Sequence, residues 1–281
     1  MKTGDKVGIV CCSNGQPQEN QERIEQLQSI LRKIGLEPVL SAYIYQKESV
    51  FSGTGKERAQ ALMDFYRDKE IKAIFDISGG DLANEILPYL DYEIIGASDK
   101  MFWGYSDLTT VINAIYAKTG NPSVLYQIRN LLYSDQETQI RNFTNTMLRE
   151  QNDLYKISYH MVQGQHMEGI VVGGNIRCLL KLAGTQYWPD MTGKILLLEA
   201  YSGKVPQMVT FLNQLQQMGV FEKINGILLG TFTQMEKEQC QSDIVELVKR
   251  YTGTEVPIAK TQQIGHGVDA KGILIGEYAC L

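Results

Sequence analysis

The sequence predicts an α/β fold, because short β-rich runs alternate along it with longer runs of helical periodicity. Its 281 residues are enough for one large domain or two modest ones with a proper core. From Asn121 to about Leu154 the chain loses its β-character and becomes polar. We interpret this stretch, with a linker helix beginning near residue 121, as the connection between domains at residues 1–150 and 151–281.

Four β-rich runs in the first half predict strands, and apolar residues at helical spacing between them predict helices. A capping box of Thr54 and Glu57 precedes one helix, and Gly120 ends another. The polar segment at residues 136–151 predicts one exposed helix within the connection. The expected strands are residues 6–12, 38–40, 71–77 and 101–103, and the expected helices are residues 24–34, 61–66, 82–87 and 108–115.

The second half repeats the alternation of strand-like and helical segments. Gly173-Gly174-Asn175 is expected to open one helix, and Pro206 suits the first turn of another. The expected strands are residues 157–162, 169–172, 194–198 and 224–229, with Ile258 and residues 273–275 as the last strand material, and a further helix is expected at residues 244–251.

Composition excludes several classes of partner. The net charge of −5 argues against a protein that neutralises phosphates, so we expect no nucleic-acid partner. No run approaches the ~18 apolar residues that span a bilayer, so we expect no membrane partner. The cysteines at positions 11, 12, 178, 240 and 280 are odd in number and irregularly spaced, which favours a reduced cytoplasmic protein.

The most informative segment is Gly104-Tyr105-Ser106-Asp107, at an expected junction between strand and helix. A serine there can point its hydroxyl off the end of the sheet, and the N–H of Asp107 lies at a helix N-terminus, where negative charge is favoured. This suits a nucleophile with half of an oxyanion hole. The alternative is that Ser106 merely caps the helix, because serine is favoured at that position. The second glycine of the G-x-S-x-G motif is replaced by Leu108.

A second expected strand end carries the turn Ser78-Gly79-Gly80-Asp81. Paired glycines let the backbone approach another group and leave N–H donors free to point at it. Gly79 and Gly80 are therefore candidates for the other half of an oxyanion hole or for binding a phosphate. A plain turn is the alternative, and no dinucleotide-binding spacing surrounds the glycines.

Two further residues complete a candidate triad. Glu199 is the first charged residue after the apolar run 195–198, so it is well placed to orient an imidazole. Of the three histidines, His266 lies between Gly265 and Gly267, and these neighbours let its ring approach another residue closely. A serine nucleophile needs a base, and the base needs orienting, so Ser106, Glu199 and His266 would supply all three roles.

Several motifs in order along the chain resemble those of the LD-carboxypeptidase family of serine peptidases, which includes the microcin C self-immunity peptidases. The resemblance covers essentially the whole chain. It is carried by residues 51–54 with Arg58, residues 71–77 leading into Gly79-Gly80, residues 87–92, Gly104-Tyr105-Ser106-Asp107, Gly173-Gly174-Asn175, residues 182–185, residues 193–199 and Gly265-His266-Gly267.

The resemblance implies a nucleophile at Ser106, a general base at His266 and its orienting carboxylate at Glu199. It implies an oxyanion hole from the N–H groups of Asp107 and the Gly79-Gly80 turn. It also implies a flavodoxin-like parallel-sheet N-terminal domain, a smaller β-containing C-terminal domain, a cytoplasmic homodimer, and a small peptide substrate without cofactor or metal. The expected reaction is removal of the terminal D-alanine from a murein tetrapeptide.

Two departures from the family bear on specificity. Ser78 stands where peptidoglycan-type members usually have an arginine, and this favours the microcin-immunity branch. Gly120-Asn121-Pro122 replaces a His-Gly-Pro segment. Cleavage of a peptidyl- or aminoacyl-nucleotide is therefore the alternative substrate class. Tyr187, Trp188 or Tyr201 would then stack on a base, although we prefer packing roles for all three.

Three other hypotheses are weaker. A ligand-binding module on a flavodoxin-like scaffold would hold a phosphorylated ligand at Gly79-Gly80 and would need neither Ser106 nor His266. A cysteine nucleophile at Cys11 or Cys12 lacks an acid–base signature. A metal site lacks ligand spacing around the remaining histidines.

Overall fold

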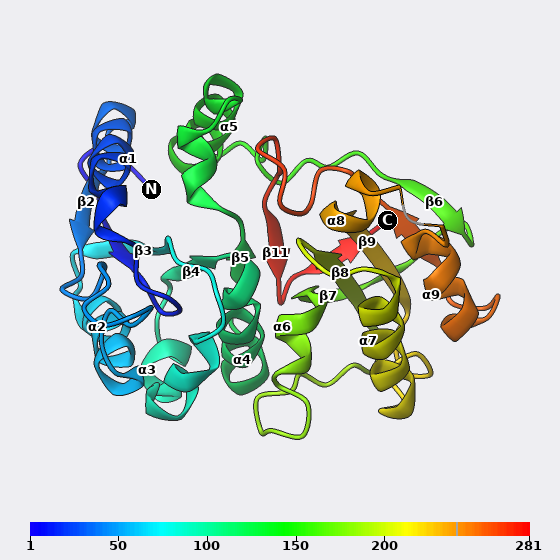
Figure 1. Ribbon diagram of the computed structural model, residues 1–281. Helices are drawn as coiled ribbons and strands as arrows, with labels where there is room; N and C mark the ends of the chain where they lie inside the picture. Colours follow the sequence, from blue (N-terminus) through cyan, green and yellow to red (C-terminus); the bar gives the residue numbers. More distant parts are fainter. Residues whose placement is uncertain (240) are drawn as a thin grey trace.

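The computed structural model describes residues 1–239 and 241–281, and within these residues the strands form two six-stranded sheets with helices packed on them (Figure 1). Cys240, one of the cysteines used in the compartment argument, lies outside the described residues. The predicted α/β class is confirmed. Most strand pairs in both sheets are parallel, so each sheet has an edge where strands end and helices begin.

The first sheet has the strand order β11-β5-β4-β3-β1-β2. Apart from β11 this is the flavodoxin-like order that was predicted. Strand β11, which comes from near the end of the sequence, pairs antiparallel with β5. The strands are β1 (Lys6–Val10), β2 (Glu37–Leu40), β3 (Ile71–Asp76), β4 (Met101–Gly104), β5 (Ser123–Leu125) and β11 (Ile273–Ile275).

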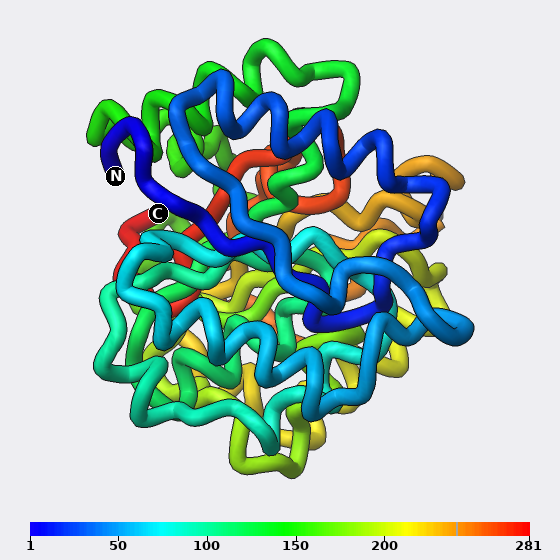
Figure 2. Tube along the Cα trace, turned by 90° about the vertical axis from the view of Figure 1, so that its left-hand side faces the viewer, coloured from blue at the N-terminus to red at the C-terminus, as the bar shows by residue number. Residues whose placement is uncertain are grey.

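Helices cover both faces of this sheet (Figures 1 and 2). Helices α1 (Gln21–Ile34) and α5 (Gln136–Leu148) pack on one face, where the buried side chains include Leu27 and Phe143. Helices α2 (Gly55–Arg67), α3 (Tyr92–Gly96) and α4 (Thr109–Thr119) cover the other face. The predicted capping box at the start of α2 is present.

The second sheet has the strand order β12-β7-β8-β9-β10-β6 and a parallel centre from β7 to β10. One of its faces packs against the helices that follow these strands. Its strands are β6 (His160–Gln163), β7 (Glu168–Asn175), β8 (Lys194–Ala200), β9 (Gly226–Phe232), β10 (Ile258–Lys260) and β12 (Tyr278–Cys280), and its helices are α6 (Ile176–Leu180), α7 (Val205–Gln217), α8 (Thr233–Lys237) and α9 (Ile244–Thr252).

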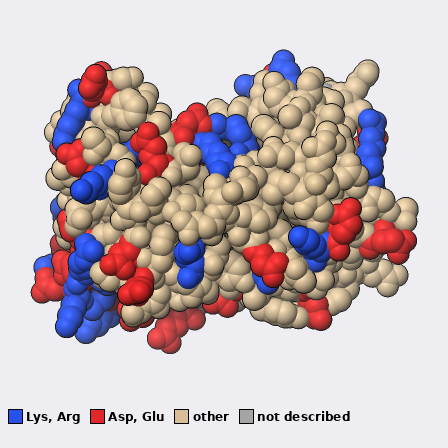
Figure 3. All heavy atoms as spheres, turned by 90° about the horizontal axis from the view of Figure 1, so that it is seen from below, with Lys and Arg blue, Asp and Glu red and all other residues tan. Residues whose placement is uncertain are grey.

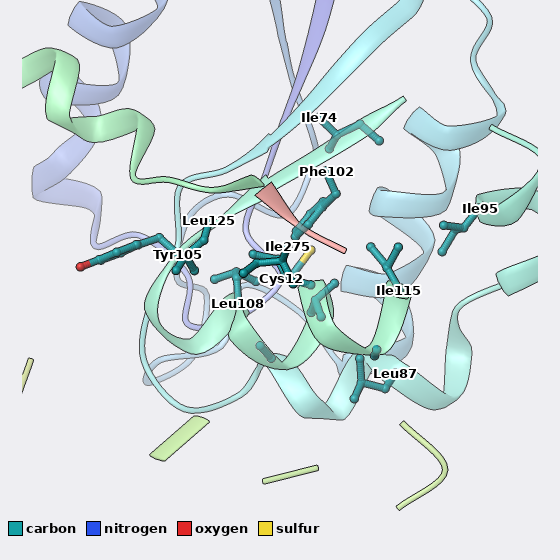
Figure 4. Close-up of a cluster of buried hydrophobic side chains, with 14 of the residues drawn as sticks. Cys12, Ile74, Leu87, Ile95, Phe102, Tyr105, Leu108, Ile115, Leu125 and Ile275 are labelled. Atoms are coloured by element: carbon teal, nitrogen blue, oxygen red, sulfur yellow. The ribbon is translucent and has the colours of Figure 1, made fainter. Parts of the chain in front are cut away.

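The two sheets share one apolar core. Ile195 and Leu197 of β8 belong to the same cluster of buried side chains as Leu108 and Leu125 from the first half of the chain. Ile275 of β11 belongs to the same cluster, and Figure 4 draws it together with Leu108 and Leu125. A cluster that draws on both sheets resists their separation, because separation would expose its apolar surface to water.

Polar contacts fix how α4 sits against β7. The side-chain amide of Asn113 donates to the carbonyl of Gly173 at 2.9 Å and accepts from its N–H at 2.8 Å. Thr109 Oγ1 accepts from the N–H of Asn175 at 3.0 Å. Gly174 has a φ of +135°, and a Cβ there would lie 2.8 Å from Thr109 Oγ1. The paired glycines therefore allow the close approach of α4.

The helix expected after Gly173-Gly174-Asn175 is present as α6: both glycines lie near the end of β7, and Asn175 caps α6 by accepting from the N–H of Cys178. Two other local predictions were wrong. The segment expected as a helix at residues 82–87 is the 3-10 helix η2 (Ala83–Tyr89), which includes Pro88. The connection after residue 121 is not free of strand, because it contains β5.

The linker helix is also less exposed than predicted. Phe143 of α5 is fully buried, and its ring centroid lies 5.7 Å from that of Phe75 and 6.1 Å from that of Trp103. The polar composition of α5 concealed this contact, because composition alone does not show that only one side of the helix faces solvent.

The face in Figure 3 carries acidic and basic side chains interspersed rather than gathered by sign. A membrane-crossing helix would need a long apolar stretch, and within residues 1–239 and 241–281 no helix has one.

We expect Phe143→Ala to lower the free energy of unfolding by about 3–5 kcal/mol, because it removes a large buried ring that α5 contributes to the core. Urea unfolding followed by circular dichroism measures this change. The matched control is Arg141→Ala at an exposed position of α5, which should change stability by less than about 0.5 kcal/mol. Equal stability of the two variants would show that α5 does not anchor the first sheet.

Candidate active site

Ser106 lies at the sharp turn between β4 and the short 3-10 helix η3 (Ser106–Leu108). Its φ is +55°, a left-handed backbone conformation that is uncommon for a residue with a side chain. Tyr105 is the N-cap of η3, and Ser106 caps neither η3 nor α4 with its side chain. Instead, Ser106 Oγ lies 3.3 Å from His266 Nε2. The structure therefore contradicts the capping alternative for this serine.

Gly104 is needed at this turn for steric reasons. A Cβ at position 104 would lie 2.6 Å from Leu108 Cβ. Gly104, the first glycine of the G-x-S-x-G pattern, therefore makes room for Leu108, which stands in place of the second glycine. The missing second glycine thus leaves the sharp turn intact.

His266 lies on a loop that approaches β9 very closely. Gly265 has a φ of +143°, and a Cβ there would lie 1.9 Å from Thr231 Oγ1, so only glycine fits. The imidazole ring lies near two tyrosine rings, with centroid distances of 4.4 Å to Tyr105 and 4.9 Å to Tyr201. These contacts limit the orientations of the ring.

Glu199 is fully buried near the end of β8, where the register between β8 and β9 shifts between Leu198 and Ala200. Such an irregularity redirects the side chain of the residue it contains. Glu199 Oε2 lies 2.7 Å from His266 Nδ1. The other oxygen, Oε1, has no hydrogen-bond partner among the described residues.

The three predicted triad residues are therefore in direct contact, although they come from both sheets. If Nδ1 of His266 donates its proton to Glu199, the unprotonated Nε2 can accept from the Ser106 hydroxyl. This arrangement can remove the proton of the hydroxyl and hold the resulting imidazolium beside a carboxylate. Burial and the charge of Glu199 raise the pKa of the adjacent Tyr105 hydroxyl well above its usual value, so Tyr105 stays neutral.

The Gly79-Gly80 turn leaves backbone donors available. Within the described residues, no acceptor takes a hydrogen bond from the N–H groups of Gly79, Gly80 or Asp107. A Cβ at Gly79 would meet no atom within 4 Å, so space lies in front of this residue. Gly80 has a φ of +120°, and a Cβ there would overlap the Asn14 amide. The geometry fits a turn that offers N–H groups to a ligand.

Asp107 connects the Gly79-Gly80 region to the sharp turn at Ser106 between β4 and η3, which we call the serine elbow. Its buried carboxylate accepts from Ser13 Oγ at 2.6 Å and from the N–H of Ala83 at 2.8 Å. Lys181, which follows α6, donates to the same carboxylate at 2.5 Å. Burial opposes the charged ammonium, but the hydrogen bond and charge of Asp107 outweigh it and raise the pKa of Lys181.

Sequence reasoning missed Lys181. Its signal is a single lysine within the otherwise apolar run from Cys178 to Leu182, since a charge buried in such a run needs a partner. Lys181 and Arg177 also pair with Asp81 in the Gly79-Gly80 turn, so α6 and the residue that follows it hold both this turn and the turn at Ser106.

The aromatic candidates separate into two groups. Tyr201 is exposed beside His266 and lines a cavity of about 390 Å³ together with it. The ring centroid of Tyr187 lies 5.9 Å from that of Tyr92. Trp188 packs against the cluster shared by the two sheets and against the cluster between the second sheet and its helices. Neither Tyr187 nor Trp188 lines that cavity, because the apolar core holds their rings. They are not placed to bind a substrate there.

Other chemistry is poorly placed. Cys11 and Cys12 are buried, and burial raises the pKa of both thiols well above the usual range, which disfavours the reactive thiolate. His166, Glu168 and Cys280 bring donor atoms within 4.8 Å of one another on the exposed edge where β12 pairs with β7. The serine elbow uses none of these groups.

We expect Lys181→Met to lower the free energy of unfolding by about 2–3 kcal/mol, because the buried Asp107 would lose its cation. The estimate is below that for a fully buried pair, since the lysine side chain is 19% exposed. Urea unfolding at neutral pH measures the change, and Lys56→Met at an exposed position of α2 is the matched control. The double variant Lys181→Met/Asp107→Asn should regain part of the loss. A Lys181→Met protein as stable as the control would contradict the prediction.

Comparison with known proteins assigns the family. Models of the LD-carboxypeptidase N-terminal and C-terminal domains match residues 7–126 and 168–281. The chain is 26% identical to the probable murein peptide carboxypeptidase of Bacillus subtilis, over 100% of this chain and 90% of that one. It is 27% identical to the microcin C7 self-immunity protein MccF of Escherichia coli, over 82% of this chain and 76% of that one.

The fold is shared with solved structures. An MccF-like protein from Bacillus anthracis aligns with a TM-score of 0.85 at 24% identity, over 100% of this chain and 94% of that one. Because the two family models together match well over half of the sequence, the chain belongs to the LD-carboxypeptidase family of serine peptidases.

Proposed function

We propose that this protein is a serine L,D-carboxypeptidase that removes the last residue of a small murein peptide. One observation carries the proposal, the continuous contact from Ser106 Oγ through His266 to the buried Glu199 carboxylate at a left-handed serine elbow. In this proposal Ser106 is the nucleophile, His266 the general base and Glu199 the residue that orients it. A binding module would have no use for this arrangement.

The mechanism follows from the contacts. His266 Nε2 takes the hydroxyl proton as Ser106 Oγ attacks the carbonyl carbon of the terminal amide. The imidazolium, stabilised by Glu199, then gives the proton to the departing amine, and an acyl-enzyme remains. Water, deprotonated by the same imidazole, hydrolyses the acyl-enzyme and restores the serine.

The developing oxyanion needs preorganised donors. The N–H of Asp107 and those of Gly79 and Gly80 are candidates, because they have no acceptor within the described residues. The Asp107 carboxylate would set the distance between the two halves of this hole, since it binds both the elbow and the segment after the turn.

The proposed substrate is a murein tetrapeptide ending in D-alanine. Support comes from relatives named as murein peptide and murein tetrapeptide carboxypeptidases, in Bacillus subtilis and Pseudomonas aeruginosa. Free cysteines among the described residues, three of them buried, support a cytoplasmic place of action. We also propose a homodimer, on the family resemblance alone.

A peptidyl- or aminoacyl-nucleotide is the second candidate substrate. Ser78 favours it, because its hydroxyl bonds the buried Asp76 at 2.5 Å and offers no cation before the paired glycines. Tyr201 supports the same reading, since its exposed ring beside His266 is available to stack on a base.

Ser106→Ala and His266→Ala should each lower kcat by about 10⁶-fold, whereas Glu199→Gln should lower it by about 10⁴-fold, since it orients rather than reacts. Release of the terminal residue is followed by mass spectrometry, with circular dichroism as the control for folding. A fluorophosphonate label that appears on the wild type and is lost in Ser106→Ala would mark the nucleophile. Hydrolysis at the wild-type rate by either alanine variant would refute the assignment.

The two substrate classes are separated by one assay. The purified protein is given a murein tetrapeptide and, in parallel, an aminoacyl-nucleotide of the microcin C type. We expect release of D-alanine from the first at a higher kcat/KM than cleavage of the second. The reverse order would favour the immunity function, and Tyr201→Ala should then weaken the nucleotide reaction selectively.

A further inference from the structure

The cavity beside His266 is lined by one positively charged side chain, that of Arg129, which has no role in the proposed triad or oxyanion hole. Its lining includes Tyr105, Arg129, Tyr133, Tyr201 and His266, and none of its lining residues is an aspartate or glutamate. Arg129 is half-buried and always charged. The wall of the cavity thus carries a permanent positive charge.

The Arg129 guanidinium is not neutralised by the protein. Within the described part of the chain, no carboxylate lies within 4.0 Å of it, and its one hydrogen bond runs from Nε to Gln127 Oε1 at 3.3 Å. Both terminal nitrogens of the planar guanidinium group therefore remain available to bind a ligand. A half-buried guanidinium without an anion loses hydration that an anionic ligand would replace.

Arg129 is held close to the reacting groups. It belongs to the 3-10 helix η4 (Ile128–Leu132), which follows β5 at the edge of the first sheet. The next residue, Asn130, donates through its amide to the carbonyl of Gly267 at 3.4 Å. This contact joins η4 to the loop that carries His266, so the cation and the imidazole are positioned together.

The other cations near the elbow are already paired. Lys181 bonds Asp107 and Asp81, and Arg177 bonds Asp81. Arg58 is buried and bonds Glu85 together with backbone carbonyls. These residues hold the structure together, whereas Arg129 faces the cavity.

We propose that Arg129 binds the terminal carboxylate of the peptide and thereby restricts the enzyme to the last amide bond. This inference rests on the proposed carboxypeptidase function. In the leaving amino acid a single carbon atom separates the scissile nitrogen from the carboxylate, so the anion must bind close to the imidazole that protonates this nitrogen. A planar guanidinium fork matches a carboxylate with two parallel hydrogen bonds.

The test compares two substrates and three proteins. The substrates are a murein tetrapeptide with a free terminal carboxylate and the same peptide as its C-terminal amide. The proteins are the wild type, Arg129→Met, and Arg141→Met as the matched control, because Arg141 is exposed on α5. Release of the terminal residue is measured by mass spectrometry, and thermal unfolding checks that each protein is folded.

The wild type and Arg141→Met should prefer the free acid. In Arg129→Met the ratio of kcat/KM for the acid to that for the amide should fall by roughly 10–100-fold, mainly through a higher KM for the acid. Arg129→Lys should keep part of the preference, since it keeps the charge but not the fork.

Three outcomes would overturn the inference while leaving the proposed function standing. They are an Arg129→Met protein with the wild-type ratio, equal losses on both substrates, and a wild type that does not distinguish acid from amide. A wild type that hydrolyses neither peptide would instead contradict the proposed function for this substrate. The two failures are therefore distinguishable.

Discussion

The contacts of His266 impose one constraint on the whole molecule, because they join residues of both sheets. Ser106 follows a strand of the first sheet, and Glu199 lies on a strand of the second, yet the imidazole reaches both, at 3.3 Å and 2.7 Å. A shift of about 1 Å between the sheets would break one of these contacts. The sheets are held by the reciprocal Asn113–Gly173 pair and by the apolar cluster that they share.

The backbone conformations at Ser106 and Gly265 help to position the hydroxyl and the imidazole that meet here. The positive φ of Ser106 and the very close approach of Gly265 to Thr231 are unfavourable in isolation. They are maintained because the surrounding structure fixes them, through the core beneath the elbow and through η4 beside the loop. Asp107, the residue after Ser106, contributes several contacts to this, since its one carboxylate accepts hydrogen bonds from Ser13, Ala83 and Lys181.

Strong local signals made much of this predictable from the sequence. The apolar run before Glu199, the glycines around His266 and the elbow at Ser106 each carry a short pattern, and these three residues meet as expected. Their catalytic roles, and the division of the chain at about residue 150, stay predictions. Lys181 and Arg129 were missed because a single cation has no periodicity, and its meaning depends on what folding brings beside it.

Long-range pairing accounts for the structural errors. Strand β5 has three residues and follows Gly120-Asn121-Pro122, so no pattern of its own distinguishes it from a loop. Its place in the sheet is defined by β4 on one side and by β11, almost 150 residues later, on the other. Gly173-Gly174-Asn175 does precede a helix, as expected, but the two glycines also admit α4, which sequence spacing does not reveal.

The position of β11 has a consequence for biosynthesis. While the chain leaves the ribosome, β5 keeps an unpaired edge until residues 273–275 have emerged, and His266 precedes them by only a few positions. The nascent first half therefore carries an open sheet edge, of the kind that invites intermolecular pairing. Completion of that sheet and arrival of the imidazole are nearly simultaneous, so in a partly synthesised chain Ser106 lacks its contact with His266 until the fold is closed.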